Sequence, residues 1–295
     1  MVDLLFQNPL FLKFLLSKMI ICNKRIRCYQ IAKIICLIIL IAIKSVAIEA
    51  QTSKTSVIYN GGAAGLGQGK NVVFISGDEE YRLEKALPML AQILAKRYGF
   101  TCTVLFATDP KTGEIDAMNQ TNINGLHELK SADLIVIFTR FRELPDSQMV
   151  YFDQYIRAGK PIIGLRTATH AFNYNRNKNS AFAYYDFKSS VKGWEDGFGR
   201  KVLGETWINH HGRHGQEGTR GVVNGIEQDK KNPIPNGVKY IRVPTDVYTV
   251  RDFNGDATTL IYIRAIVDYL SPYHPTMLGL ALFKKGEFPS MYESK

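Results

Sequence analysis

The sequence predicts an α/β fold, a flavodoxin-like three-layer sandwich in which helices cover both faces of a mainly parallel sheet. Short apolar runs, typical of strands buried on both faces, alternate with segments whose apolar residues recur at helical spacing. This alternation favours right-handed strand–helix–strand crossovers, which build parallel sheets. Glycine and proline residues mark where these segments end.

A leader is expected at residues 1–50. Lys24, Arg25 and Arg27 precede an unbroken apolar run at 34–43, and small residues follow at positions 45 and 47, which a signal peptidase reads. The apolar run is too short to span a bilayer, so we expect export to the periplasm or the cell exterior, with a retained membrane anchor as the alternative. Residues 51–70 are interpreted as a polar, Gly-rich linker.

The main domain is expected at residues 71–262. Its first strands are predicted at 71–75, 101–106, 134–138 and 162–165. Its helices are predicted at 83–98, where Gly99 is the C-cap, and at 125–130 and 146–158. Further strands are predicted at 201–207, 238–243 and 258–263. Residues 263–295 are expected to be a divergent tail, for which a frameshift is one explanation.

Composition limits the classes of function. The chain has a formal net charge of +10, of which residues 1–50 supply half, so the remainder is mildly basic and indicates no nucleic-acid partner. Of the four cysteines, only Cys102 lies outside the leader, within an apolar strand. We therefore expect neither an internal disulfide nor a cysteine nucleophile.

Three of the predicted strands, those at 71–75, 134–138 and 162–165, end in polar side chains, and we call these ends the first, second and third tips. In an open parallel sheet, ligands bind at the carboxyl ends of the strands. The residues expected to bind a ligand at these three tips are Glu79, Glu80, Arg82, Arg140, Arg166 and Thr167. Arginine grips carboxylates and phosphates through paired hydrogen bonds. The alternative for the first tip is a helix N-terminus with acidic residues, which the helix dipole favours. The alternative for the second tip is an ordinary pair of surface arginines.

The third tip, residues 164–168, has the form of a nucleophile turn but places Arg166 at its centre. Arginine stays protonated, so it can bind an anion or polarise a carbonyl but cannot act as a nucleophile. His170 follows, and it is a candidate proton shuttle because histidine titrates near neutral pH. A packed helix residue is the alternative for His170.

A Gly-rich loop follows Asn209. Within a stretch of five residues it contains three of the six histidines of the chain, His210, His211 and His214. Its compliant backbone lets them approach a substrate. We favour a metal-free polar site. Zinc is an alternative that we do not favour, because no second cluster of ligands completes a site; a solvated loop is another.

Asp246 and Tyr248 form a later polar pair. Asp246 is suited to orient a histidine, and Tyr248 is suited to hydrogen-bond a hydroxyl group. A simple turn is the alternative.

The motifs GDEEYR, GLRTATHAF, NHHGRHG and TDVYTV, in that order, resemble those of the ThuA-like (trehalose-utilisation) family, in the class I glutamine amidotransferase-like superfamily. The resemblance covers roughly residues 71–261. It implies a flavodoxin-like fold without the amidotransferase cysteine, and a link to sugar metabolism. The chain departs from the family at Arg166, where many relatives have His, at Leu83, where His often stands, and at Asp246, which aligns with a Glu.

We therefore predict an exported protein that acts on or binds a saccharide or an oxidised sugar. As an enzyme it would be a hydrolase or isomerase that uses acid–base catalysis by His170, His210, His211, His214 and Asp246. Asn209 and Tyr248 would join the strand-tip residues in binding the ligand. The alternative is a non-catalytic carbohydrate-binding or scaffold protein, since a fold alone does not decide function. The sequence specifies neither a cofactor nor an oligomeric state.

Overall fold

The computed structural model describes residues 51–53, 56–62, 64–211, 218–223, 233–238, 241–243, 245–251, 254–255, 257 and 260–266. The expected leader, His214 and residues 267–295 of the expected tail lie outside the described residues. None of the helices in the described ranges combines the length and apolar character that crossing a bilayer requires.

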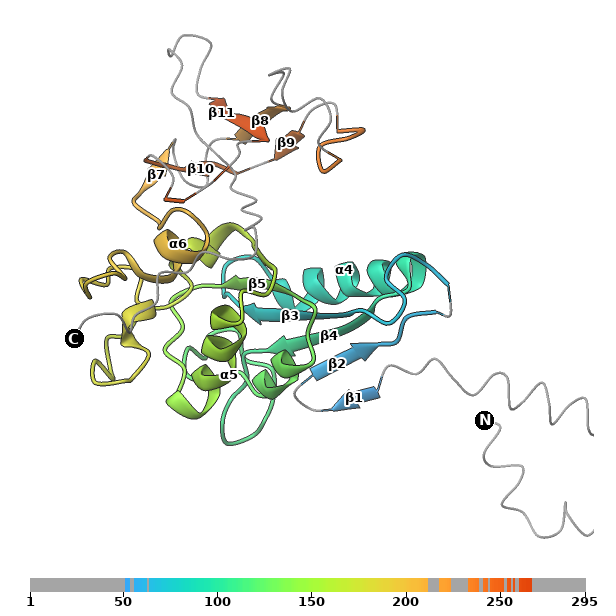
Figure 1. The fold of residues 1–295 in the computed structure, drawn as a ribbon, viewed down its shortest axis with the longest axis horizontal. Helices are drawn as coiled ribbons and strands as arrows, with labels where there is room; N and C mark the ends of the chain where they lie inside the picture. The colour runs from blue at the N-terminus through green and yellow to red at the C-terminus, as the bar shows by residue number, and fades with distance from the viewer. Residues whose placement is uncertain are drawn as a thin grey trace, which may run out of the picture. The chain divides into compact units, whose positions relative to one another are not determined.

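A mixed, mainly parallel sheet forms the centre of the fold (Figure 1), with the strand order β1-β2-β4-β3-β5-β6. The strands are β1 (Gln51–Ser53), β2 (Ser56–Tyr59), β3 (Asn71–Gly77), β4 (Thr101–Phe106), β5 (Leu134–Thr139) and β6 (Ile162–Gly164). Strands β4, β3, β5 and β6 are parallel, while β2 pairs antiparallel with β4 and β1 pairs antiparallel with β2. The parallel strands therefore follow the 2-1-3-4 order of flavodoxin-like sheets.

Part of the expected linker is a strand. β2 pairs along β4 from Ser56 opposite Leu105 to Tyr59 opposite Cys102. Val57 and Tyr59 pack against the core beside β4. The prediction of a linker at 51–70 is therefore wrong for these residues, because their backbone groups satisfy the otherwise open edge of β4.

Helices cover both faces of the sheet (Figure 1). α4 (Leu83–Tyr98) packs on the face that carries Val72 and Phe74 of β3. α5 (Asp146–Arg157) packs on the opposite face, which carries Val73 and Ile75. Alternation along one buried strand thus supplies both layers of the core. The short helix expected at 125–130 is the 3₁₀ helix η1 (Leu126–Lys130).

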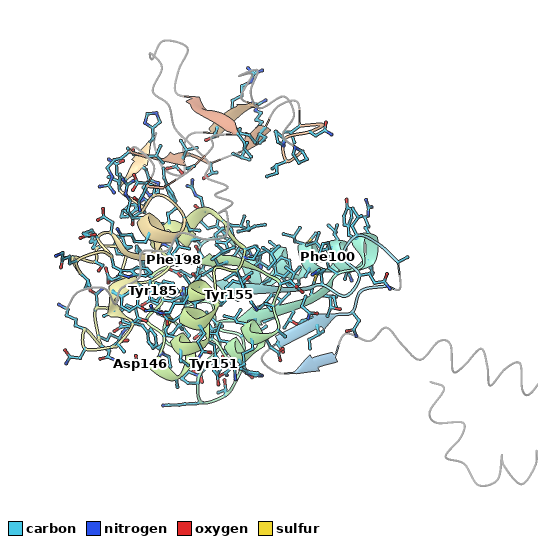
Figure 2. The ribbon with its side chains drawn as sticks, in the orientation of Figure 1. Phe100, Asp146, Tyr151, Tyr155, Tyr185 and Phe198 are labelled. Carbon is cyan, nitrogen blue, oxygen red and sulfur yellow. The ribbon has the colours of Figure 1, made fainter. Side chains whose placement is uncertain are left out.

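Aromatic rings anchor the later chain against α5. Phe152 of α5 contacts Tyr185, in the 3₁₀ helix η3 (Ala183–Tyr185), and Phe198, in α6 (Gly197–Val202), with ring centroids 5.8 and 5.4 Å away. The Tyr185 hydroxyl donates to Asp153 of α5 at 3.0 Å. Figure 2 labels Tyr185 and Phe198 among the side chains of this region. These contacts fix the segment that leads into the site.

The strand predicted at 201–207 is wrong. Lys201 and Val202 end α6, and the chain continues without a strand to β7 (His210–His211). α6 begins beside the third strand tip, where a Cβ at Gly199 would lie 2.1 Å from the carbonyl oxygen of Thr169. This close backbone packing, which local propensity does not report, selects the helix.

Two small antiparallel sheets complete the described chain. β10 (Val247–Tyr248) pairs with β7, and β8 (Gly218–Val223) pairs with both β9 (Ile241–Val243) and β11 (Ile261–Ile266). β9 and β11 overlap the strands predicted at 238–243 and 258–263. β11 also runs across the boundary expected between the domain and the tail at 262/263.

Candidate functional site

The segments that follow β3, β5 and β6 each hold a non-glycine residue in the left-handed backbone region. Arg82 has φ 49°, Phe141 has φ 52° and Arg166 has φ 45°. Such conformations cost roughly 1–3 kcal/mol each, and they cluster at functional sites. Three of the four non-glycine residues with positive φ in the described chain therefore lie at the carboxyl edge of the sheet; the fourth, Asp196, precedes α6.

Glu79 joins the first tip to the second. Its carboxylate accepts hydrogen bonds from Arg140 and from Nη2 of Arg142, the latter at 2.6 Å. Arg140 also forms an ion pair with Glu80 at 3.0 Å. This carboxylate–guanidinium network holds the ends of β3 and β5 together.

Arg142 is a residue that the sequence analysis did not assign to the site. Its side chain is fully buried, and Nε donates to the carbonyl oxygen of Arg140 at 2.8 Å while Nη1 donates to that of Ala117 at 3.2 Å. Burial lowers the pKa of the guanidinium, and Glu79 opposes that shift. Arg142 therefore braces the loops behind the site, and the signal for it was an arginine placed shortly after a buried strand.

Asp78 joins the first tip to the third. The carboxylate is buried, accepts a hydrogen bond from the Thr167 hydroxyl, and accepts another from the backbone N–H of Glu80 at 2.6 Å. Burial raises the pKa of the Asp78 carboxyl, although both hydrogen bonds act in the opposite direction. Thr167, expected to bind a ligand, is itself buried and directs its hydroxyl to Asp78.

Arg166 reaches from the third tip to the segment around β10. Nη1 donates to the carbonyl oxygen of Asp246 at 2.7 Å, and Nη2 donates to Oδ1 of the same residue at 2.6 Å. Nε donates to the hydroxyl of Tyr81 at 3.2 Å, and the guanidinium lies 4.1 Å from the centre of the Tyr248 ring. One side chain thus connects the first tip, the third tip and β10.

The carboxylate of Asp246 contacts two side chains at once. It is fully buried, and while Oδ1 accepts from Arg166, Oδ2 lies 2.5 Å from Nδ1 of His210. The pairing of β7 with β10, which sets His210 opposite Tyr248, brings this histidine to the carboxylate. A carboxylate on Nδ1 fixes the orientation of the ring and directs Nε2 away from it.

His170 lies at the end of the 3₁₀ helix η2 (Arg166–His170), among aromatic rings. Its ring centroid is 4.9 Å from that of Phe141, 5.2 Å from that of Trp207 and 5.5 Å from that of Tyr248. Burial, helped by the positive charges of Arg140 and Arg166, lowers the pKa of His170 to about 3. His170 is therefore neutral at pH 7 and is suited to hydrogen bonding rather than to proton exchange at that pH.

Three other predicted residues lie at the margin of these contacts. The Arg82 side chain is 74% exposed and pairs with Glu84 at 3.8 Å. Asn209 is exposed, and its carbonyl oxygen accepts the backbone N–H of Thr249 at 3.0 Å. His211 neighbours His210 in β7, so strand alternation directs its side chain to the opposite face.

Cys102 lies inside β4 and is fully buried. Burial raises the pKa of its thiol to about 12, so it is neither accessible nor ionised at neutral pH. Within the described ranges, no group of three or more His, Cys, Asp or Glu side chains is arranged to hold a metal ion.

The fold and the site together define an α/β protein with a mainly parallel sheet, whose strand tips converge on a buried carboxylate and the half-buried histidine that it contacts. Comparison with known proteins finds no matching family model and no matching curated protein.

Proposed function

We propose that the chain is an exported protein of the ThuA-like type, on a class I glutamine amidotransferase-like fold. We propose further that it binds a saccharide or an oxidised sugar and transforms it, as a hydrolase or an isomerase, by histidine-based acid–base catalysis. The order of its four motifs and the 2-1-3-4 order of its parallel strands support this reading. The observation that carries it is the chain of contacts from Arg166 through Asp246 to His210.

This chain of contacts supplies an oriented base. Because Asp246 holds Nδ1 of His210, proton exchange with a substrate falls to Nε2. In hydrolysis, His210 would take a proton from water as the water oxygen bonds to the reacting carbon, and would return it to the sugar oxygen whose bond breaks. In isomerisation, it would move one proton between neighbouring carbons, while the hydroxyl proton on the first carbon passes to the carbonyl oxygen of the second. Neutral His170 would hydrogen-bond a sugar hydroxyl.

The same geometry argues against covalent catalysis at the third tip. Arg166 stands where an elbow carries its nucleophile, and its guanidinium is already paired with Asp246. Cys102 is sealed inside β4. A mechanism in which histidine acts on water or on a substrate proton therefore fits the chain better than one with an acyl- or glycosyl-enzyme intermediate.

The test is turnover of a panel of disaccharides, glycosides and keto-sugars, followed by release of reducing sugar and by NMR of the products. His210→Gln and Asp246→Asn are compared with His127→Gln, which changes a histidine that is 63% exposed and pairs with Glu128 on η1. General acid–base groups contribute roughly 10²–10⁴-fold to rate, so His210→Gln should lower kcat by at least about 100-fold. His127→Gln should leave kcat unchanged. Equal activity of the His210 and His127 variants would contradict the assignment.

The second candidate is a non-catalytic carbohydrate-binding or scaffold protein. It is favoured by the arginine at the elbow centre and by the low pKa of His170, which together leave the third tip without a reactive group at neutral pH. Saturable binding of a sugar in calorimetry, with no product formed over hours, would decide for this candidate.

A further inference from the structure

Four rings beside Asp246 form a closed set, which we call the four-ring cluster: Trp207, His170, Tyr248 and His210. Successive ring centroids around the set are 5.2, 5.5, 5.5 and 5.8 Å apart. The rings come from the segment before β7, from η2, from β10 and from β7. Trp207 is therefore a direct neighbour of both histidines of the proposed site, although the sequence analysis gave it no role.

Hydrogen-bonding capacity in the four-ring cluster is left unused. Nε1 of Trp207 is buried and finds no hydrogen-bond partner among the residues that the structure describes. His170 is buried, and the one hydrogen-bonding contact of its imidazole ring within the described chain is between Nδ1 and the Thr169 hydroxyl, at 3.2 Å. A buried N–H without an acceptor is costly, so each such group calls for an explanation. An indole N–H can only donate, so the group that satisfies it must present an acceptor such as oxygen.

The charges around the four-ring cluster are already matched. Arg140 pairs with Glu79 and Glu80, Arg142 pairs with Glu79, and Arg166 pairs with Asp246. With buried Asp78 included, four acidic side chains face three guanidinium groups. A carboxylate or phosphate entering this region would have to displace one of these acids, so the local electrostatics disfavour an anionic ligand.

We propose that the four-ring cluster is the subsite for an uncharged sugar ring, with Trp207 as its specificity-determining contact. The inference rests on the proposed function and narrows its substrate class from any saccharide or oxidised sugar to neutral sugars, keto-sugars included. Trp207 Nε1 donates to a sugar oxygen, and the aromatic faces cover the apolar C–H face of the ring. Sugar acids are excluded because the arginines of the site are already in ion pairs with acidic side chains.

Two single-tryptophan variants of the full chain test this, because the chain has only two tryptophans. Trp194→Phe leaves Trp207 as the sole reporter, while Trp207→Phe leaves Trp194, which packs against Tyr184 and Tyr185 with ring centroids 4.7 and 5.0 Å away. Both variants are titrated with D-glucose and D-glucuronate, and with D-galactose and D-galacturonate. The members of each pair differ only by the carboxylate at C6. Trehalose is added as a neutral disaccharide.

A neutral sugar should change the emission of the Trp194→Phe variant and leave that of the Trp207→Phe variant unchanged. Its acidic counterpart should bind at least about tenfold more weakly, as expected when a buried charge meets no free partner. Calorimetry should show that Trp207→Phe, which keeps an aromatic ring but lacks the N–H, raises Kd roughly threefold to tenfold. Its melting temperature should fall no further than that of Trp194→Phe, because the lost N–H has no partner in the described part of the chain.

The outcomes separate the two proposals. If acidic sugars bind as tightly as their neutral counterparts, or if Trp207→Phe binds neutral sugars with unchanged affinity, the subsite assignment is overturned while the proposed function stands. If calorimetry detects no binding of any sugar, neutral or acidic, to the unmodified chain, both proposals fall.

Discussion

At the scale of single residues, His170 shows how surroundings change the chemistry of a side chain. It is 3% exposed, and it faces the positive charges of Arg140 and Arg166 from the second and third tips. Burial removes the hydration that stabilises a charged imidazolium, and the two arginines repel its positive charge, so the neutral form of His170 is favoured. A histidine that the sequence suggests as a proton shuttle thus becomes a neutral hydrogen-bonding group.

The low pKa of His170 predicts a loss of stability in acid. The pKa falls from 6.5 in the unfolded chain to about 3 in the folded one, so between these pH values only the unfolded state binds the proton. The unfolding free energy therefore decreases as the pH falls below 6.5, by about 2 kcal/mol from this group at pH 5. His170→Asn removes this term, so the stability advantage of the unmodified chain over the variant should shrink by about that amount between pH 7.5 and pH 5.

Urea unfolding at the two pH values measures this difference. His127→Asn is the control, because it replaces an exposed histidine. An advantage that stays constant from pH 7.5 to pH 5 would show that His170 is accessible to protons in the folded state.

The sequence separates residues of the same type poorly. Arg140 and Arg142 stand two positions apart after the same strand, and nothing in the local pattern says which is exposed. In the structure Arg142 is fully buried and donates to backbone carbonyl oxygens, while Arg140 pairs with Glu79 and Glu80. The difference arises from where the loop at 117–119 lies, which is a tertiary property.

At the scale of elements, glycine determines where the two long helices end. Gly99 follows α4 with φ 80°, and Gly159 follows the end of α5 with φ 64°. A Cβ at Gly99 would lie 2.7 Å from the carbonyl oxygen of Ala64, whereas a Cβ at Gly159 would meet nothing within 4 Å. Both positions therefore require a left-handed backbone conformation, but only at Gly99 would a Cβ also clash with a neighbouring segment.

Paired substitutions separate these two effects. Gly159→Ala should cost about 1 kcal/mol, the usual penalty for a left-handed non-glycine residue. Gly99→Ala should cost at least about 1 kcal/mol more, because the segment at residue 64 must also move. Denaturant unfolding of both variants measures the costs. Equal costs would mean that the contact between the end of α4 and residue 64 is looser than the structure shows.

Helices and strands whose local sequence pattern is strong were predictable from the sequence. Those whose conformation depends on contacts with distant segments were not. The apolar runs of β3, β4 and β5 and the periodic face of α4 mark those elements within one or two residues of their bounds. α6 was mistaken for a strand because its short sequence is helical only where Gly199 meets the backbone of the third tip. β2 was mistaken for a linker because its four residues gain order by pairing with β4.

At the scale of the whole molecule, β2 protects the outer edge of the parallel strands. Its antiparallel pairing covers β4 along four residues, and Val57 and Tyr59 add to the core on the α4 side. An uncovered strand edge invites pairing with another chain.

Removal of β2 should therefore cause self-association. A chain that begins at Asn71 exposes the edge of β4, whereas a chain that begins at Gln51 keeps it covered. Size-exclusion chromatography with light scattering should show larger species for the shorter chain alone. The same distribution of sizes for both chains would contradict a protective role for β2.

The site depends on contacts that no local pattern specifies. Because parallel strands share a carboxyl edge, the sequence predicted that the three tips lie at one edge of the sheet. It also indicated Asp246 as a residue suited to orient a histidine. It could not pair Arg166 with Asp246, which lie 80 positions apart, or choose His210 over His211. That choice follows from the pairing of β7 with β10.

A double-mutant cycle between Arg166 and Asp246 tests most directly whether these distant segments meet in one site. The unfolding free energy is measured for the unmodified chain, Arg166→Gln, Asp246→Asn and the double variant. The buried ion pair, in which Nη2 of Arg166 lies 2.6 Å from Oδ1 of Asp246, predicts that the two costs are not additive, with a coupling energy of at least about 1 kcal/mol. Costs that add to within about 0.5 kcal/mol would mean that the two residues do not meet, and the account of the site would be contradicted.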